Sequence, residues 1–292
     1  MPGVEVGDIG AKLGYNSVDN GYLLFRDYRV PRSALLCRFA EITKEGDFEL
    51  KSDPRMLYQI MSQTRLSIIM GCAFNLFRSG MIATRYAVCR RQFANQKNTK
   101  KERKLLDYQV HMENLGKNLS NGLTIFLAGK TIDELHKVSM VEFKQGDFKN
   151  LDLLHHLTAG VKSFATEMCY VGLDEMRQAC GGAGFLLTSG ISDQWSDIAP
   201  FPTFEGVNPV MAQQSARFIF KNAKRVDKGQ QPDKLFSYLA STEELIASKS
   251  TATTVAQFQT LDHIERTLAV RAAQSVKNVR ELINASKASK KE

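Results

Sequence analysis

The sequence predicts a mainly α-helical protein, a helical bundle preceded by a short β segment. Beyond residue 53, apolar residues recur at spacings of three and four over long stretches, which is typical of amphipathic helices. Residues 1–50 are instead rich in glycine and aromatic residues and contain an alternating stretch, residues 22–30, which indicates strands. The 292 residues, 43% hydrophobic and 24% charged, are sufficient for a sizeable packed core.

The β segment is delimited by turn-forming residues. Asn20-Gly21 precedes the alternating stretch and Pro31 follows it, which favours a strand between them. Asp53-Pro54 then supplies an N-cap and a first-turn proline, so the first long helix is expected to begin there.

The helical part is predicted to contain several long segments and one functional loop. The expected helices are 54–86 or 54–93, 103–129, 150–180, 208–224, 232–248 and 252–286. Residues 181–208, punctuated by glycine and proline, are predicted to be a loop, and a loop of that length is usually functional. Polar and turn-forming residues at 227–232 predict a domain boundary, so the expected domains are 1–50, 54–225 and 230–292.

The net charge of +8 comes mainly from two basic segments, 97–104 and 271–292. Neither is interleaved with the aromatic residues that stack on bases, so a solvated loop and tail are expected rather than a nucleic-acid site. Ligands that carry phosphate remain possible. No apolar run approaches the roughly 20 residues that cross a bilayer, so no membrane span is expected. Five cysteines without a C-x-x-C pair predict free, mostly buried thiols in a reducing compartment.

A cationic segment, residues 85–93, closes the first long helix. Positive side chains are favoured at a helix C-terminus by the helix dipole and need no ligand there. A guanidinium such as that of Arg90 is also the natural partner of a pyrophosphate, because it donates two parallel hydrogen bonds. Both interpretations stay open at this point.

A second segment, residues 178–185, takes a helix into a glycine cluster. A glycine C-cap explains the pattern without a ligand. Glycines also let a backbone approach phosphate groups that a Cβ would exclude. The pattern is not a dinucleotide-binding G-x-G-x-x-G after a strand, so it does not decide between the two.

The third segment is a proline-bracketed turn, residues 202–209, in which Glu205 follows an aromatic residue. A single glutamate in a loop is more often solvated than catalytic. If apolar neighbours surround it, its pKa is raised and it can take a proton near neutral pH. His111 and His155-His156 lack metal-ligand spacing, and no metal site is expected.

In this order the motifs resemble the acyl-CoA oxidase family of acyl-CoA dehydrogenase-like flavoproteins. The matching segments include Gly7-Asp8-Ile9-Gly10, Asp19-Asn20-Gly21-Tyr22, Arg90-Arg91-Gln92, Leu157-Thr158-Ala159-Gly160 with Lys162, Ala179-Cys180-Gly181-Gly182 and Phe204-Glu205-Gly206. The resemblance covers residues 1 to about 225. It implies that 1–50 end the family's middle β-domain, that 54–225 form its first C-terminal helical domain and that 230–292 begin a second helical domain.

The resemblance implies an FAD-dependent oxidation of fatty acyl-CoA to trans-2-enoyl-CoA, with oxygen reduced to hydrogen peroxide. Glu205 would be the base that removes the α-proton, held out of water and beside the glycine cluster, while Arg65 and Gly206 would contact the substrate. FAD held by a partner subunit would contact these residues: Arg90, Gln92, Gln178, Gly181 and Gly182.

Departures from the family pattern leave alternatives open. The segment 181–185 lacks an imidazole and a phenol found in the family, and Val207-Asn208-Pro209 alters the continuation after Glu-Gly. The N-terminal half of the family fold has no counterpart here, so the expected partners are fatty acyl-CoA and either a second copy of the chain or a missing N-terminal half. A non-catalytic interaction or assembly module is the alternative to an enzyme.

The compartment is also open. The resemblance implies a peroxisomal protein, but the last residues, 289–292, are not the Ser-Lys-Leu signal, so a mitochondrial or cytoplasmic location remains an alternative.

Overall fold

A computed structural model describes residues 2–51, 53, 56–95 and 98–288. The chain divides into two compact units, Met1–Gln214 and Ser215–Glu292, each described here by itself. The division falls inside helix α6 (Asn208–Asp227), before the turn-rich segment 227–232. Pro54, the predicted first-turn residue, and Lys290 and Lys291 of the basic tail lie outside the described residues.

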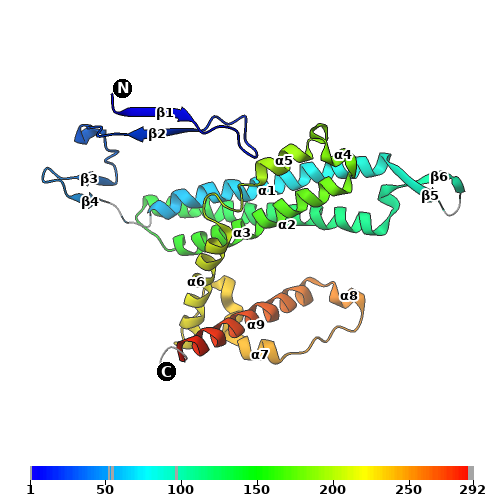
Figure 1. Cartoon of the computed structure of the whole chain (residues 1–292). Helices are drawn as coiled ribbons and strands as arrows, with labels where there is room; N and C mark the ends of the chain where they lie inside the picture. The colour runs from blue at the N-terminus through cyan, green and yellow to red at the C-terminus, as the bar shows by residue number, and fades with distance from the viewer. Residues whose placement is uncertain (1, 52, 54–55, 96–97, 289–292) are drawn as a thin grey trace. The chain divides into compact units, whose positions relative to one another are not determined.

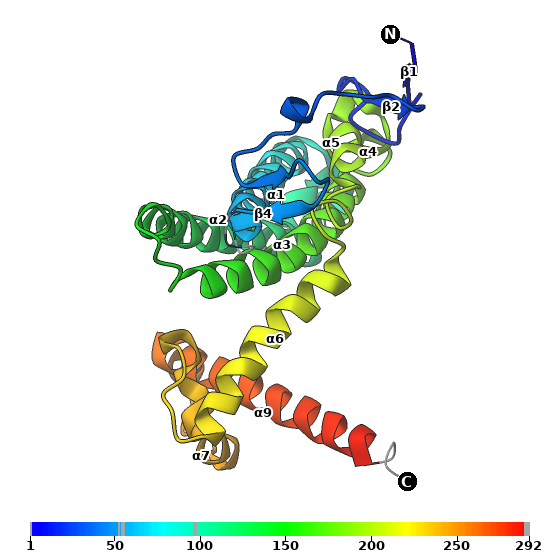
Figure 2. The same ribbon diagram turned by 90° about the vertical axis from the view of Figure 1, so that its left-hand side faces the viewer.

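Three long helices form the centre of the first unit. Helices α1 (Met56–Cys89), α2 (Gln109–Lys144) and α3 (Leu151–Ala179) pack side by side (Figure 1; Figure 2). Their facing surfaces bury a core that includes Leu76, Ile125, Leu154 and Leu173. Removing these side chains from water is the main stabilisation of the bundle. The predicted mainly helical fold is confirmed.

Helix α2 continues well past the predicted end at residue 129. Its buried face runs on through Gly129, Ile132, His136 and Ser139, again at spacings of three and four. Because His136 and Ser139 are polar, the apolar periodicity that predicts a helix cannot be recognised in this part of the sequence. A polar side chain at a core position reflects contacts with neighbouring helices, here a hydrogen bond from Ser139 Oγ to Gln59 Oε1 of α1 at 3.4 Å.

The N-terminal residues form two short antiparallel hairpins. Strand β1 (Val4–Asp8) pairs with β2 (Gly21–Phe25), and β3 (Ala40–Ile42) pairs with β4 (Phe48–Leu50) (Figure 1). The predicted strand at 22–30 therefore ends at Phe25. Asp27 adopts φ 48°, a left-handed conformation that turns the chain out of the extended region and explains the early end.

The basic segment after α1 is a β-hairpin rather than the expected loop. Strand β5 (Arg91–Asn95) pairs antiparallel with β6 (Asn98–Lys104), and the hairpin extends beyond the end of α1 (Figure 1). Because a two-stranded hairpin on the surface buries neither face, charged residues do not prevent the backbone from pairing. Lys97 lies outside the described residues.

The predicted loop at 181–208 is largely helical. It contains α4 (Gly182–Phe185), the 3₁₀ turn η3 (Leu187–Ser189) and α5 (Ile191–Ile198). Ile191, Gln194 and Ile198 are buried at spacings of three and four, so α5 packs on the bundle despite the surrounding glycines and prolines. The loop prediction was wrong for this helix, which is too short to give a clear periodicity in the sequence.

A specific contact joins the β segment to the bundle. The backbone N–H of Tyr15 donates a hydrogen bond to Asp197 Oδ1 of α5 at 2.6 Å. The ring of Tyr15 stacks on Phe201, with ring centroids 6.4 Å apart. At Gly14, a Cβ atom would lie 2.3 Å from the carbonyl oxygen of Ser196, so only glycine permits this approach.

Replacing Gly14 with alanine is therefore expected to detach residues 12–16 from α5. Since the added carbon overlaps the backbone of Ser196, hydrogen exchange of the Tyr15 amide should accelerate by roughly tenfold or more, while amides of α3 keep their protection. Gly116→Ala is the control, because nothing lies within 4 Å of its added carbon. Unchanged exchange at Tyr15 would contradict this account of the contact.

The second unit contains the end of α6 and the C-terminal helices. These are η4 (Lys234–Ser241), α7 (Thr242–Ala247), α8 (Val255–Phe258) and α9 (Leu261–Ala288). The helix predicted at 252–286 is interrupted between α8 and α9, and a capping box formed by Thr254 and Gln257 starts the short α8. Ion pairs Lys277–Glu243 and Arg280–Asp227 link α9 to α7 and to the end of α6.

Among the described residues, one helix segment, Gln59–Cys89 of α1, is long and apolar enough by length and composition to cross a membrane, which was not expected from the sequence. Half of its most apolar stretch of 18 residues is buried inside the protein, and core helices meet the same criterion of length and composition.

Candidate functional site

Glu205 lies on a tight turn between α5 and α6. The backbone N–H groups of Thr203 and Phe204 both donate to the carbonyl of Pro200 at 2.9 Å, and the N–H of Asn208 donates to the carbonyl of Pro202 at 2.9 Å. Glu205 itself has φ 54°, a left-handed conformation that non-glycine residues rarely adopt. A glutamate in this conformation must be held there by its surroundings.

Two buried cations hold the turn from the bundle. Arg65 of α1, 2% exposed, donates from Nε to the carbonyl oxygen of Glu205 at 3.2 Å. Lys162 of α3, 0% exposed, donates from Nζ to the carbonyl oxygen of Gly206 at 2.7 Å. A second guanidinium nitrogen of Arg65 lies 3.4 Å from His155 Nδ1. The structure thus brings Arg65, Glu205 and Gly206, three of the predicted site residues, into contact.

Burial changes the acidity of both cations. The pKa of Lys162 is lowered from 10.5 to about 8, chiefly because burial disfavours the ammonium and secondly because Arg65 is positive. Cys72 and Glu205 act in the opposite direction. Burial also lowers the pKa of Arg65, and the negative charge of Glu205 opposes that shift. The Glu205 carboxylate is thus electrostatically attracted to both cations.

Stability should depend on pH through Lys162. Its pKa in the folded protein, about 8, lies below the ordinary 10.5, so between these values the unfolded chain binds more protons and stability rises with pH. The contribution is present above pH 10.5 and is lost as the pH falls through 8. In urea unfolding at pH 7 to 10, Lys162→Met should remove this part of the rise, whereas Lys130→Met, on the exposed face of α2, should not. Equal pH profiles for wild type and Lys162→Met would contradict the assignment.

An apolar cleft of about 590 Å³ has Phe204, the residue before Glu205, in its wall. Its walls come from residues 12–20 of the β segment and residues 199–204, including Leu13, Tyr15 and Phe204. The ring of Phe204 lies 5.0 Å from that of Phe201, which is buried in the core, so this wall of the cleft is packed on the bundle. This cleft is wide enough for a flat ring or an acyl chain.

Glu205 itself is exposed, which corrects the expectation that it is held out of water. The residues that surround it in this chain contact the backbone of the turn, through Arg65 and Lys162, and leave the carboxylate open. Enclosure of that carboxylate would require atoms beyond those of the described residues.

A second concavity brings together two of the predicted cofactor residues, Gln92 and Gln178. They line a pocket of about 480 Å³ at the end of the bundle that carries the β5–β6 hairpin. The other walls are mainly apolar or aromatic, from Phe93, Leu105, Tyr108, Val110, His111, Asn114 and Ala179. The Tyr108 hydroxyl donates to the carbonyl of Gln92 at 2.9 Å, which fixes the start of β5 beside α2.

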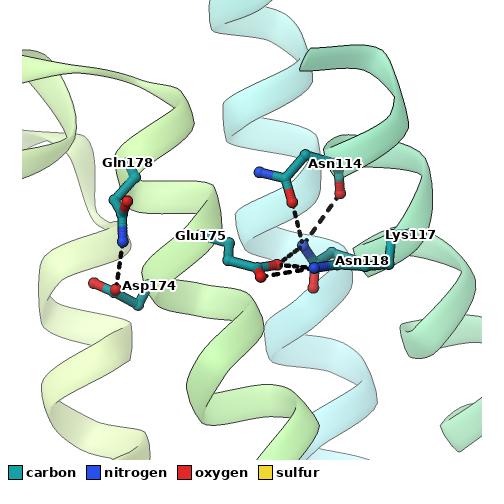
Figure 3. Close-up of polar contacts among 6 residues, drawn as sticks. All are labelled: Asn114, Lys117, Asn118, Asp174, Glu175 and Gln178. Carbon is teal, nitrogen blue, oxygen red and sulfur yellow. Dashed lines mark hydrogen bonds and ion pairs between the residues drawn. The ribbon is translucent and has the colours of Figure 1, made fainter. Parts of the chain in front are cut away.

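The side chain of Gln178 is oriented by its own helix. Its Nε2 donates to Asp174 Oδ2 at 2.6 Å (Figure 3). One turn away on α3, Glu175 accepts a hydrogen bond from Asn118 Nδ2 at 2.6 Å and forms an ion pair with Lys117 (Figure 3). These contacts tie the end of α3 to α2 and leave the other groups of the Gln178 amide available.

His111 is another residue in the wall of this pocket. Its Nε2 is buried and, among the described residues, has no hydrogen-bond partner. Burial lowers the pKa of His111, which favours the neutral ring. The sequence offered only the absence of metal-ligand spacing at this histidine, and its place in the pocket became visible only when residues 92–93, 105–114 and 178–179 were brought together.

The glycine cluster follows the C-terminus of α3. Gly181 has φ 57°, and neither Gly181 nor Gly182 has an atom within 4 Å of the place where a Cβ would stand. Gly184 differs, because its Cβ would lie 1.9 Å from the carbonyl oxygen of Arg177. The first two glycines therefore leave their backbone open to a ligand, and the third is required for packing.

Arg90 follows the last residue of α1 and is exposed. Its backbone N–H donates to the carbonyl of Tyr86 at 2.8 Å, and its carbonyl accepts from the N–H of Leu105 at 3.0 Å. It does not line the pocket of Gln92 and Gln178 among the described residues. The structure thus places Arg90 next to that pocket along the chain but not in its wall.

The two candidate regions are separate. Lys162, at the Glu205 turn, and Gln178 are 16 residues apart on α3, which corresponds to about 24 Å along a helix axis. The expectation that Glu205 stands beside the glycine cluster was therefore wrong. Sequence order could not reveal this, because the turn at 202–206 folds back from α5 onto the middle of α3.

Lys162 is the main residue of the site to which the sequence analysis assigned no role. A signal was present, since it shares the core face of α3 with Ala159, Thr166 and Cys169 at spacings of three and four. A lysine at a core position is costly unless it has a partner, so it indicates a specific contact. Within the described ranges, no group of three or more histidine, cysteine or acidic residues is arranged to hold a metal ion.

The three packed helices, the turn of Glu205 and the Gln92–Gln178 pocket define a helical-bundle domain with two separate candidate sites. A family model described as "Acyl-CoA oxidase, C-alpha1 domain" matches residues 58–220, more than half of the chain. The chain therefore belongs to the acyl-CoA oxidase family.

Individual proteins similar to this chain are also acyl-CoA oxidases by name. Peroxisomal acyl-coenzyme A oxidase 1 of Mus musculus is 34% identical over 279 residues, which cover 94% of this chain and 42% of the mouse protein. The solved structure of Arabidopsis thaliana acyl-CoA oxidase 1 has a TM-score of 0.89 at 30% identity, covering 95% of this chain and 43% of that one. Acyl-CoA oxidase-1 of Caenorhabditis elegans, solved with FAD and ATP, has a TM-score of 0.77 at 32% identity, covering 96% and 41%. The chain thus spans less than half the length of these relatives.

Proposed function

We propose that this chain contributes the catalytic base and one wall of the active site to an FAD-dependent oxidation of fatty acyl-CoA to trans-2-enoyl-CoA. The observation that carries the proposal is the turn of Glu205, held in a left-handed conformation by two buried cations beside an apolar cleft. Family membership supports it, since curated relatives are named acyl-coenzyme A oxidases. We extend their peroxisomal location to this chain as part of the proposal.

In this reaction Glu205 would accept the α-proton of the thioester. Its carboxylate, exposed in this chain, is available to a substrate that approaches along the apolar cleft. Gly206 and Arg65 would fix the turn from which the carboxylate acts. When bound, FAD supplies the acceptor for the hydride that leaves the β-carbon, and its reoxidation by oxygen yields hydrogen peroxide.

The residues around Gln92 and Gln178 fit one end of the cofactor. Two neutral amides and a mainly apolar wall suit an adenosine group, because an uncharged heteroaromatic ring needs a flat apolar surface and a few hydrogen bonds. The exposed backbone of Gly181 and Gly182 has space for phosphate oxygens, and the exposed guanidinium of Arg90 could bind them.

The turn of Glu205 and the Gln92–Gln178 pocket are about 24 Å apart along α3. This distance supports a model in which the two regions contact different bound molecules. Glu205 would act on substrate at one cofactor, and the Gln92–Gln178 pocket would hold the adenosine end of a cofactor bound by a second subunit. A homodimer, or a complex with an N-terminal half of the same family, would meet this requirement. It would also supply the atoms that enclose Glu205.

The test is to purify the chain, add FAD and measure two quantities. Flavin absorbance that remains with the protein after gel filtration is expected, together with peroxide release on addition of a long-chain acyl-CoA. Light scattering on the same sample gives the number of subunits. A chain that retains no flavin and releases no peroxide would refute the activity for this polypeptide.

A non-catalytic assembly module is the second candidate, favoured by the exposed apolar residues of the β1–β2 hairpin. Val6, Leu23 and Phe25 are each more than 60% exposed. Exposed apolar strands commonly mark an interface with another chain. This function predicts that Phe25→Asp weakens assembly in cells, whereas Glu205→Gln has no phenotype; the reverse pattern would refute it.

A further inference from the structure

Lys162 is buried in the bundle core and directed at the turn of Glu205. Its ammonium donates to the carbonyl of Gly206 at 2.7 Å and to Asn208 Oδ1 at 3.3 Å. It lies on α3 and contacts residues more than 40 positions later in the chain. A fully buried ammonium is costly, so these bonds must compensate for lost water.

Asn208 accepts hydrogen bonds from three residues of α3, and these bonds join the turn of Glu205 to that helix. Its Oδ1 also accepts from Thr166 Oγ1 at 3.0 Å, and its carbonyl accepts from Ser163 Oγ at 3.1 Å. Three residues from one turn of α3, Lys162 among them, therefore hold the residue at which the turn of Glu205 ends and α6 begins. Asn208 belongs to Val207-Asn208-Pro209, the segment that departs from the family pattern after Glu205-Gly206. In this chain that departure supplies the residue that bonds the turn to α3.

Two successive carbonyl groups, those of Glu205 and Gly206, are held from different helices. Arg65 of α1 binds the carbonyl of Glu205, and Lys162 of α3 binds the carbonyl of Gly206. The N–H of Phe204, bonded to the carbonyl of Pro200, holds the chain before Glu205, and the two carbonyls and Asn208 hold the chain after it. The N–Cα bond between these fixed points therefore has little freedom to leave φ 54°. Without these bonds the left-handed conformation of a glutamate is unfavourable, and the turn would relax.

We propose that Lys162 is a positioning residue for Glu205, holding the carbonyl of Gly206 and the side chain of Asn208 so that Glu205 stays in its left-handed conformation. The importance of this for catalysis rests on the proposed function, whereas the hold on the turn does not. With a pKa of about 8, the amine is mainly protonated at neutral pH and donates as an ammonium.

The proposal can be tested by measuring how fast a glutamyl endopeptidase cleaves the chain after Glu205. The protease cleaves after glutamate only when the backbone opens into its active site, so the rate after Glu205 reports how often the turn relaxes. Cleavage after Glu142, which is 8% exposed, reports unfolding of the bundle in the same sample. Fragments ending at the two residues are distinguished by mass.

Lys162→Met in the full chain should raise cleavage after Glu205 on the order of tenfold or more, the change expected when a hydrogen bond to a charged group is lost. Cleavage after Glu142 should stay within about twofold, and Lys130→Met should change neither rate. No increase after Glu205, or an equal increase at both residues, would overturn the proposal unless Lys162→Met unfolds the bundle.

If Lys162→Met does unfold the bundle, Asn208→Ala decides the question. It removes the acceptor shared by Lys162 and Thr166 and leaves the ammonium bound to Gly206. A rise after Glu205 alone is expected, and its absence refutes the part of the proposal in which Lys162 acts through the side chain of Asn208. In protein that turns over acyl-CoA, Lys162→Met should lower kcat about tenfold or more with little change in KM. Failure of the oxidase proposal would appear as no turnover in the wild type, while the cleavage result stands independently.

Discussion

Glu205→Gln is expected to lower peroxide release from a long-chain acyl-CoA by about 10² to 10⁴-fold, the usual contribution of a general base. Glutamine keeps the shape of the side chain and cannot accept the α-proton. Because Arg65 binds the carbonyl oxygen of Glu205 and not its carboxylate, the turn should persist. The free energy of unfolding should therefore change by less than about 0.5 kcal/mol.

The measurement is peroxide release under saturating FAD and substrate, with urea unfolding of the same samples. Glu134→Gln, on the exposed face of α2, is the matched control and should retain full activity. An active Glu205→Gln variant would show that another group removes the proton. A variant with lost activity and a large loss of stability would indicate a structural role for the carboxylate instead.

Gly184→Ala is expected to destabilise the first unit by about 2 to 4 kcal/mol. Its Cβ would lie 1.9 Å from the carbonyl oxygen of Arg177, an overlap of backbone atoms that no change of rotamer relieves. The end of α3 and the short α4 would have to separate. Urea unfolding followed by the fluorescence of Trp195, the single tryptophan, measures the loss.

Gly182→Ala separates packing from ligand binding in the same cluster. Nothing lies within 4 Å of its added carbon, so its effect on stability should be below about 1 kcal/mol. If the cluster receives phosphate oxygens, the methyl group should nevertheless weaken FAD binding roughly tenfold or more. Equal FAD affinity in Gly182→Ala and wild type would remove this glycine from the cofactor site, and a stable Gly184→Ala would refute the packing argument.

Glu205→Gln tests the turn of Glu205, whereas Gly184→Ala and Gly182→Ala test the glycine cluster that follows Gln178 at the end of α3. The turn of Glu205 presents a carboxylate whose backbone is held from inside the bundle. The Gln92–Gln178 pocket presents neutral amides on an apolar wall, at the end of the bundle where β5, the start of α2 and the end of α3 meet. A chain that spans less than half of its relatives can keep both surfaces, because each depends on contacts within the first unit.

Prediction from the sequence succeeded where the information is local. The three-four periodicity predicted α1, α3 and α6 because each helix buries one face along its whole length. It failed at the end of α2, where His136 and Ser139 occupy core positions, and at the short helix α5. Hairpin β5–β6 was missed because strand pairing between charged residues has no apolar signal.

The order of motifs along the chain was enough to identify the family and to single out Glu205 and the glutamines, since these depend on residue type and spacing. Only the tertiary structure brought Gln92 of strand β5 and Gln178 in the last turn of α3 to one pocket. It also separated Glu205 from the glycine cluster and directed the buried Lys162 at the Gly206 carbonyl. The physical reason is that exposure, charge environment and hydrogen-bond partners are set by residues distant in the chain, which a linear pattern does not contain.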